Sequence, residues 1–100
     1  MTNEQNARIA SALAGYEVQV SPAGKHYIVT DEGTRALVDF ENSWDEAMTT
    51  FLAIAKSRQL PWRITPGWVE IGNSRVFYYQ KMPTLSAVAH CLLQIAEGEE

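Results

Sequence analysis

Two groups of short, strand-like segments constrain the fold of this chain more than any other feature of its sequence. The segments are rich in β-branched and aromatic residues, and they span residues 16–20, 27–29, 36–40, 62–64, 68–71 and 75–79. Short turns join the segments within each group, whereas parallel strands need a crossover of about a dozen residues or more. Each group is therefore predicted to form antiparallel strands.

Three segments with apolar residues at helical spacing flank and separate the strand groups, and they span residues 2–14, 43–58 and 84–96. Thr2 and Gln5 have the spacing of a capping box, as do Ser43 and Glu46, and Thr84 is the predicted N-cap of the last helix. The second segment is expected to bury one wide apolar face, made of Trp44, Met48, Phe51, Leu52 and Ala55.

The element order that follows is α-β-β-β-α-β-β-β-α. Strands grouped in short-looped runs favour an α+β fold over a doubly wound sheet. We expect three helices packed on a mostly antiparallel sheet, in a sandwich-like arrangement. A chain of 100 residues suits one domain, residues 1–100, with a frayed acidic tail at 97–100.

Composition limits the compartment and the partners. No apolar stretch approaches the roughly 20 residues that cross a bilayer, and residues 1–6 are polar, without a signal-peptide pattern. Cys91 is the single cysteine, so no internal disulfide can form. We expect a cytoplasmic protein of a bacterial host cell, with no membrane partner. The net charge of −4 disfavours nucleic acid as a partner.

Acidic residues are concentrated between Asp31 and Glu46, a segment that contains six acidic residues and one arginine. Within this region, Asp39, Glu41, Asp45 and Glu46 form the candidate acidic site. One interpretation is a solvated acidic face. The other is a surface that imitates a nucleic-acid backbone and occupies a basic groove on a partner protein, with its charge accelerating association.

No catalytic, metal-binding or cofactor-binding motif emerges from the sequence. His90 and Cys91 are adjacent on a predicted helix and point about 100° apart, so they cannot form a nucleophile–base pair. His26, the other histidine, is expected at the surface, and no spacing suggests further metal ligands. The chain is interpreted as a non-enzyme without cofactor.

The segment from residue 61 to residue 81 is the best candidate for a binding surface. Its candidate residues are Trp62, Trp68, Arg75, Phe77, Tyr78 and Tyr79. Side chains alternate across a strand, so the outer face presents either Tyr78, or Phe77 together with Tyr79. Such residues dominate binding hot spots. The alternative is that these aromatic side chains complete a small core.

Three stretches carry a family resemblance: Asn6–Leu13, Asp39–Met48 and Thr84–Leu93. The first resembles the opening helix, the second the aromatic-then-polar start of the central helix, and the third the closing helix of the phage ABA (α/β/α) sandwich domains, a family of small bacteriophage and prophage proteins. The aromatic content of residues 61–79 departs from that pattern. The resemblance implies a layered sandwich of viral origin, and it favours a binding role without naming an activity.

Four functions remain open at this point. The first is a non-catalytic accessory protein that binds a host or phage protein, with inhibition of a host defence system as its anti-CRISPR-like form. The second is a single-stranded nucleic-acid binder that uses the aromatic hairpin with nearby cations. The third is a small ligand-binding domain or enzyme. The fourth, compatible with the first, is a homodimer formed by strand edges.

Overall fold

Helices and strands follow the predicted order in a computed structural model of the chain, which describes residues 1–98. The nine elements are α1 (Asn3–Ala12), β1 (Glu17–Val20), β2 (His26–Thr30), β3 (Gly33–Ala36), α2 (Trp44–Ser57), β4 (Trp62–Ile64), β5 (Val69–Gly72), β6 (Phe77–Gln80) and α3 (Thr84–Glu97). The α+β class and the antiparallel pairing within each strand group are both confirmed. Within the described residues, no helix is long and apolar enough to cross a membrane.

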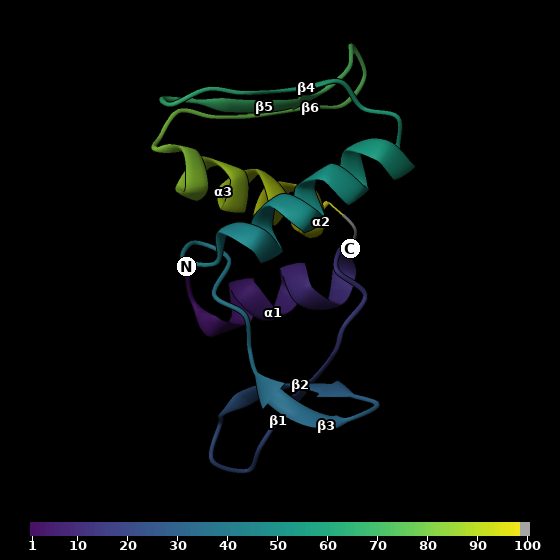
Figure 1. Ribbon diagram of the computed structural model, residues 1–100, viewed down its shortest axis with the longest axis vertical. Coiled ribbons are helices and arrows are strands. Elements are labelled where there is room, and N and C mark those ends of the chain that lie inside the picture. The colour runs from purple at the N-terminus through teal and green to yellow at the C-terminus, as the bar shows by residue number, and fades with distance from the viewer. Residues whose placement is uncertain (99–100) are drawn as a thin grey trace.

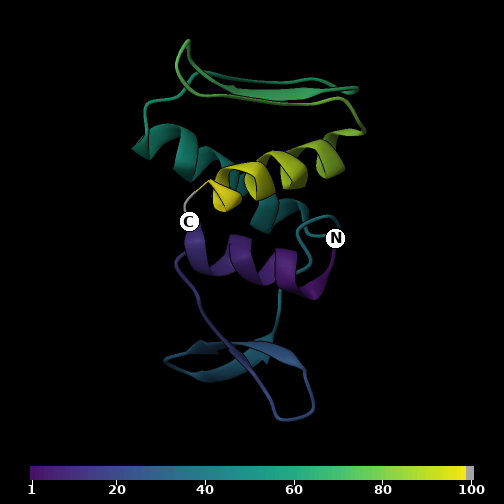
Figure 2. The ribbon, with the colours of Figure 1, turned by 180° about the vertical axis from the view of Figure 1, so that it is seen from behind.

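The strands form two separate three-stranded sheets, one in the order β1-β2-β3 and the other in the order β4-β5-β6. Figure 1 shows these sheets at opposite ends of the molecule, with the three helices between them, and Figure 2 shows the same layers from behind. The expectation of a single sheet was wrong. The 14-residue helix α2, about 21 Å long, separates the two strand groups, and the second group packs on the opposite side of the helices.

Helix α3 is the centre of the core. Eight of its fourteen residues are buried, and they are Ala87, Val88, Ala89, Cys91, Leu92, Leu93, Ile95 and Ala96. A helix that is apolar nearly all round must be covered on several sides. Accordingly, α3 contacts α1, α2 and the β4–β6 sheet, and Val69 and Ile71 of the central strand are fully buried on that sheet's inner face.

Helix α2 buries a different face from the predicted one. Phe51 and Ala55 are buried as expected, but Trp44 and Leu52 are exposed, at 50% and 40% of their surface. The buried positions are Ala47, Thr50, Phe51, Ile54 and Ala55, a stripe of small and apolar side chains rotated away from Trp44. The small residues let α2 approach α3 closely, whereas the large indole of Trp44 stays outside.

Some predicted boundaries and caps were also wrong. The third strand ends at Ala36 instead of continuing to Phe40, because Val38 and Phe40 pack into the helical core rather than pairing in the sheet. The capping box of Thr2 and Gln5 is confirmed, but the Ser43 side chain makes no capping bond. Glu97 closes α3, and the part of the predicted frayed tail at 99–100 lies outside the described residues.

Thr84 is the first residue of α3 rather than its cap. Pro83 occupies the N-cap position and offers no side-chain hydrogen bond. Instead, the Thr84 hydroxyl donates to the Thr65 carbonyl oxygen at 3.1 Å, and this bond ties the start of the helix to the β4–β5 turn.

A buried hydrogen bond joins α1 to the segment that leads into α2. Asn6 is only 4% exposed, and its Oδ1 accepts a bond from the Phe40 N–H at 3.1 Å. Phe40 itself is fully buried. Because a buried N–H without an acceptor is costly, this bond fixes the path by which the chain leaves the first sheet and enters the helical layer.

Asn6→Ala removes the only described side-chain acceptor of the Phe40 N–H. The buried donor is then unsatisfied, and we expect a loss of about 1–3 kcal/mol in the free energy of unfolding. Urea denaturation followed by circular dichroism measures this loss. Asn42→Ala is the matched control, since Asn42 is exposed and bonds only Asp39 nearby. Equal stability of both variants would contradict the role assigned to Asn6.

Gly72 is the glycine that the fold requires most strongly. Its φ is +142°, and a Cβ at this position would lie 2.1 Å from the Val76 carbonyl oxygen and 2.5 Å from the Phe77 Cα. Val76 lies in the β5–β6 connection and Phe77 begins β6, and both contacts are with backbone atoms, so neither can rotate away. The start of the aromatic strand β6 therefore lies so close to position 72 of β5 that only glycine fits there.

Gly72→Ala should destabilise the protein by at least about 2 kcal/mol, through positive-φ strain and the backbone clash. Gly67→Ala is the control, because Gly67 lies in an open turn and a methyl group added there would have no heavy atom within 4 Å. Thermal unfolding of both variants tests the prediction. A Gly72→Ala protein with wild-type stability would show that the β5–β6 connection relaxes freely.

Candidate functional site

The sheet β4–β6 has two chemically different faces, which its register defines. Arg63 lies opposite Glu70, and Glu70 lies opposite Tyr79. These three side chains therefore share the outer face, in a row across all three strands. Trp68, just before β5, lies two positions from Glu70, and Phe77 lies two positions from Tyr79. Both side chains therefore belong to the same face. We call these five residues the aromatic face.

Contacts within the aromatic face hold its side chains together. The rings of Trp68 and Tyr79 lie 6.0 Å apart with a tilt of 34°. The Arg63 guanidinium lies 6.0 Å from the centre of the Trp68 ring and 3.9 Å from the Glu70 carboxylate. Phe77 is 57% exposed and Tyr79 44%. The result is a preordered, uncovered aromatic patch with one cation and one anion in it.

The inner face of the same sheet belongs to the core. Tyr78 lies opposite Ile71 and packs against the buried cluster. Trp62 also lies opposite Ile71, and its ring meets the Phe51 ring edge-on at 6.1 Å and 85°. Trp62 remains 48% exposed at the sheet edge. Of the two predicted faces, the structure thus exposes Phe77 with Tyr79, and turns Tyr78 inward.

Arg75 lies in the connection between β5 and β6, away from the centre of the aromatic face. The Asn73 Oδ1 accepts bonds from the N–H groups of Arg75 and Val76, at 2.9 and 3.0 Å. The exposed Arg75 side chain therefore projects from a tightly turned loop. It adds positive charge at one end of the sheet.

The predicted acidic site is divided by internal contacts. Glu41 accepts bonds from the Met1 amino group and from His90. Glu46 accepts from the Tyr16 hydroxyl at 3.1 Å and from Arg35 at 3.4 Å.

The other two acids of the predicted site, Asp39 and Asp45, are exposed. Asp39 accepts from the Glu41 N–H and from the Asn42 side chain, whereas Asp45 is exposed in the first turn of α2. Only part of the acidic region is thus free to meet a partner.

The histidines and the cysteine stay apart. His90, on α3, lies beside Glu41, whereas Cys91 is fully buried, with its thiol 3.7 Å from the Val69 carbonyl oxygen. Burial raises the pKa of the Cys91 thiol to about 12, which keeps it protonated and unreactive. His26 is half-buried rather than a surface residue. Across residues 1–98, no three metal-ligating side chains converge.

Comparison of the chain with protein-family models, with curated proteins and with solved structures gives no match. The resemblance to phage ABA sandwich domains therefore stays a prediction, and the site is interpreted from its geometry.

The predicted binding residues did not include two members of the aromatic face, Arg63 and Glu70. The signal that could have found them is strand register: once β5 is the central strand, its outward residue Glu70 must lie between outward residues of β4 and β6. Register depends on where the two turns place each strand, and the sequence alone left this open.

Glu41 makes the stability of the protein depend on pH. The hydrogen bond from the Met1 ammonium, aided by that from His90, holds the pKa of Glu41 below its ordinary value of 4.5, although partial burial acts in the opposite direction. A carboxyl with a lowered folded-state pKa stabilises the fold above its unfolded pKa, and this contribution is lost as the pH falls through the folded value.

Glu41→Gln should therefore be less stable than wild type at neutral pH. The difference should shrink as the pH falls below 4.5 and disappear once the pH is below the folded-state pKa of Glu41. Urea unfolding over a pH series measures it. Glu32→Gln is the control for the loss of a carboxylate, because Glu32 lies exposed in the β2–β3 turn, and it should match the stability of wild type at neutral pH. A pH-independent effect of Glu41→Gln would mean that the carboxylate charge plays no part.

Proposed function

We propose that this protein is a non-catalytic binding module whose protein partner docks on the aromatic face of the β4–β6 sheet. One observation carries the proposal: Trp68, Phe77 and Tyr79 form a preordered patch on the outer side of a sheet whose inner side is already filled by the core. These aromatic side chains are thus not needed to complete the interior.

The composition of the patch suits protein recognition. Trp, Tyr and Arg are the residue types most enriched among binding hot spots, because each buries a large area and keeps a polar group. The Arg63 guanidinium already lies 6.0 Å from the centre of the Trp68 ring, so a docking surface meets a cation and an aromatic ring side by side. Exposed clusters of this kind mark interaction sites more often than scattered apolar residues do.

A protein partner fits this face better than single-stranded nucleic acid. Glu70 lies on the central strand, between Arg63 and Tyr79, and its carboxylate would repel phosphates along any path across the sheet. Its pairing with Arg63 also offsets the nearest cation. The net charge of −4 acts in the same direction at longer range.

The resemblance to small phage proteins extends the proposal to a host or phage protein as the partner, including a host defence component that the docking would inhibit. The acidic region contributes less than its sequence suggested, because Glu41 and Glu46 already have intramolecular partners. The aromatic face, rather than imitation of nucleic acid, is therefore the basis of recognition in this proposal.

The test compares tagged baits in bacterial host lysate. We expect wild type to retain a specific protein that the double variant Phe77→Ser/Tyr79→Ser does not retain. With the purified partner, each single substitution should raise the Kd by at least about tenfold, as for a hot-spot residue. Both side chains are largely exposed, so their loss should change thermal stability little.

Trp44→Ser is the matched control, since Trp44 is equally exposed but lies on α2, outside the aromatic face. This variant should retain the partner with wild-type affinity. Equal retention by all baits, or none by wild type, would overturn the proposal. Tight binding of a labelled oligonucleotide, abolished by Phe77→Ser/Tyr79→Ser, would instead establish the nucleic-acid alternative.

A further inference from the structure

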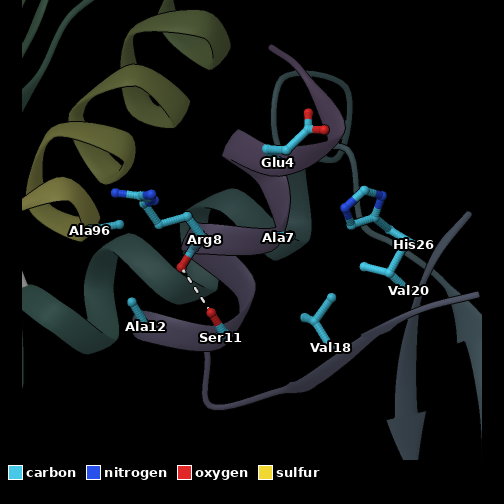
Figure 3. A pocket seen from close by; sticks show the side chains of 9 residues that line it. All are labelled: Glu4, Ala7, Arg8, Ser11, Ala12, Val18, Val20, His26 and Ala96. Atoms are coloured by element: carbon cyan, nitrogen blue, oxygen red, sulfur yellow. Dashed lines mark hydrogen bonds between the residues drawn. The ribbon is translucent and has the colours of Figure 1, made fainter. Parts of the chain in front are cut away.

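A cleft of about 490 Å³ lies between α1 and the first sheet, at the end of the molecule opposite the aromatic face. Figure 3 shows its walls: Val18, Val20 and His26 on one side, and Ala7, Ser11 and Ala12 of α1 on the other. Ala7, Ser11 and Ala12 are too small to reach across the cleft, so the valines of β1 are left partly uncovered. Val20 is 56% exposed.

Strand β1 is an edge strand, and its unpaired backbone groups belong to the same valines. The Ser21 N–H donates to the Lys25 carbonyl oxygen, which fixes the alternation of the ladder with β2. Gln19, two residues before Ser21, is therefore also at a hydrogen-bonded position, and its backbone N–H and C=O groups face Tyr27 of β2. Val18 and Val20 lie at the non-bonded positions of this ladder, so their N–H and C=O groups point away from β2.

No other described strand pairs with that edge of β1. The edge thus offers two N–H and two C=O groups, one set at Val18 and one at Val20, about 6.8 Å apart. This is the repeat of alternate residues in an extended chain. A strand laid there would complete the backbone bonding of β1 and place alternate side chains against the cleft.

Polar groups at the cleft add chemistry to this geometry. The His26 Nδ1 is buried and has no hydrogen-bond partner among the described residues, so a polar group with an unmet hydrogen bond lies in the cleft wall. Glu4 lines the cleft, whereas the Arg8 side chain extends towards Ala96 of α3. Both charged side chains line the cleft, but the one nearer the β1 wall is Glu4, which favours a cationic ligand group on that side.

From these observations, we infer that the cleft and the free edge of β1 together bind an extended peptide segment as an added strand. The peptide places apolar side chains at alternate positions against Val18 and Val20, and a lysine or arginine against Glu4. Backbone bonds to the two valines supply the pairing, and the cleft supplies the preference for side chains. This site is independent of the aromatic face and of the partner proposed there.

The probe is the capped hexapeptide KVTVTK, titrated into isotope-labelled protein and followed by NMR. We expect shifts of the Val18, Val20 and Ser11 amide signals. Amide hydrogen exchange of Val18 and Val20 should slow on binding, because their N–H groups become bonded. In an antiparallel pair, the peptide valines lie opposite Val18 and Val20 and supply the N–H groups that bond to β1. KVTVTK with both valines N-methylated lacks these donors and should bind at least about fivefold more weakly. The peptide EVTVTE should also bind more weakly, through repulsion by Glu4.

Val18→Pro tests the edge directly, since it removes an N–H that points away from β2 and spares the ladder. It should weaken KVTVTK binding at least about fivefold. Ala7→Leu, which fills the cleft from the helix side, should weaken binding to a similar degree. It tests the same site if the Val18→Pro protein proves unstable. Glu17→Gln, on the opposite face of β1, should leave binding unchanged.

Three results would overturn the inference. One is the absence of any shift at Val18 and Val20 with KVTVTK at millimolar concentration. Another is equal binding of KVTVTK and its form with both valines N-methylated, which would make the cleft a site for side chains or small molecules only. The third is a dimer in light scattering whose formation Val18→Pro abolishes, since a second copy would then occupy the edge.

Discussion

The need to cover helix α3 on nearly every side determines the rest of this structure. Its buried residues run around the helix rather than along one stripe, and no single sheet or helix can remove such a surface from water. Helices α1 and α2 cover one part of it, and the inner face of the β4–β6 sheet covers another. The two sheets consequently lie at opposite ends of a molecule 42 Å long.

This arrangement leaves each sheet with a different kind of free surface. The β4–β6 sheet uses Val69 and Ile71 to cover α3, so its outward side chains are free to vary without loss of the core. The β1–β3 sheet buries only Ile28 completely, and the α1 residues Ala7, Ser11 and Ala12 across the cleft are too small to cover it. The free surface of this sheet therefore consists of partly uncovered valines and an unpaired strand edge, rather than a patch of large side chains.

Local sequence signals predicted the order and class of the elements, because turns and helical periodicity act over a few residues. They failed where tertiary packing decides. Val38 and Phe40 alternate like a strand, yet they enter the helical core, and Trp44 has helical spacing with Phe51 but stays exposed. Likewise, the pairing of Phe77 with Tyr79 on the outside could be stated as one of two options, but choosing it required knowing which face α3 occupies.

The two surfaces differ in the way they can discriminate between partners. The aromatic face presents side chains whose shape and charge are fixed by their neighbours, so recognition there depends on a complementary folded surface. The β1 edge presents backbone groups that every extended peptide can meet, and its selectivity comes from the side chains that line the adjacent cleft, among them Val18, Val20 and Glu4. Because the helical layer separates these surfaces, substitutions at one should act additively with substitutions at the other. Occupancy of either surface would leave the second accessible, since neither lies in the path of a ligand bound at the opposite end.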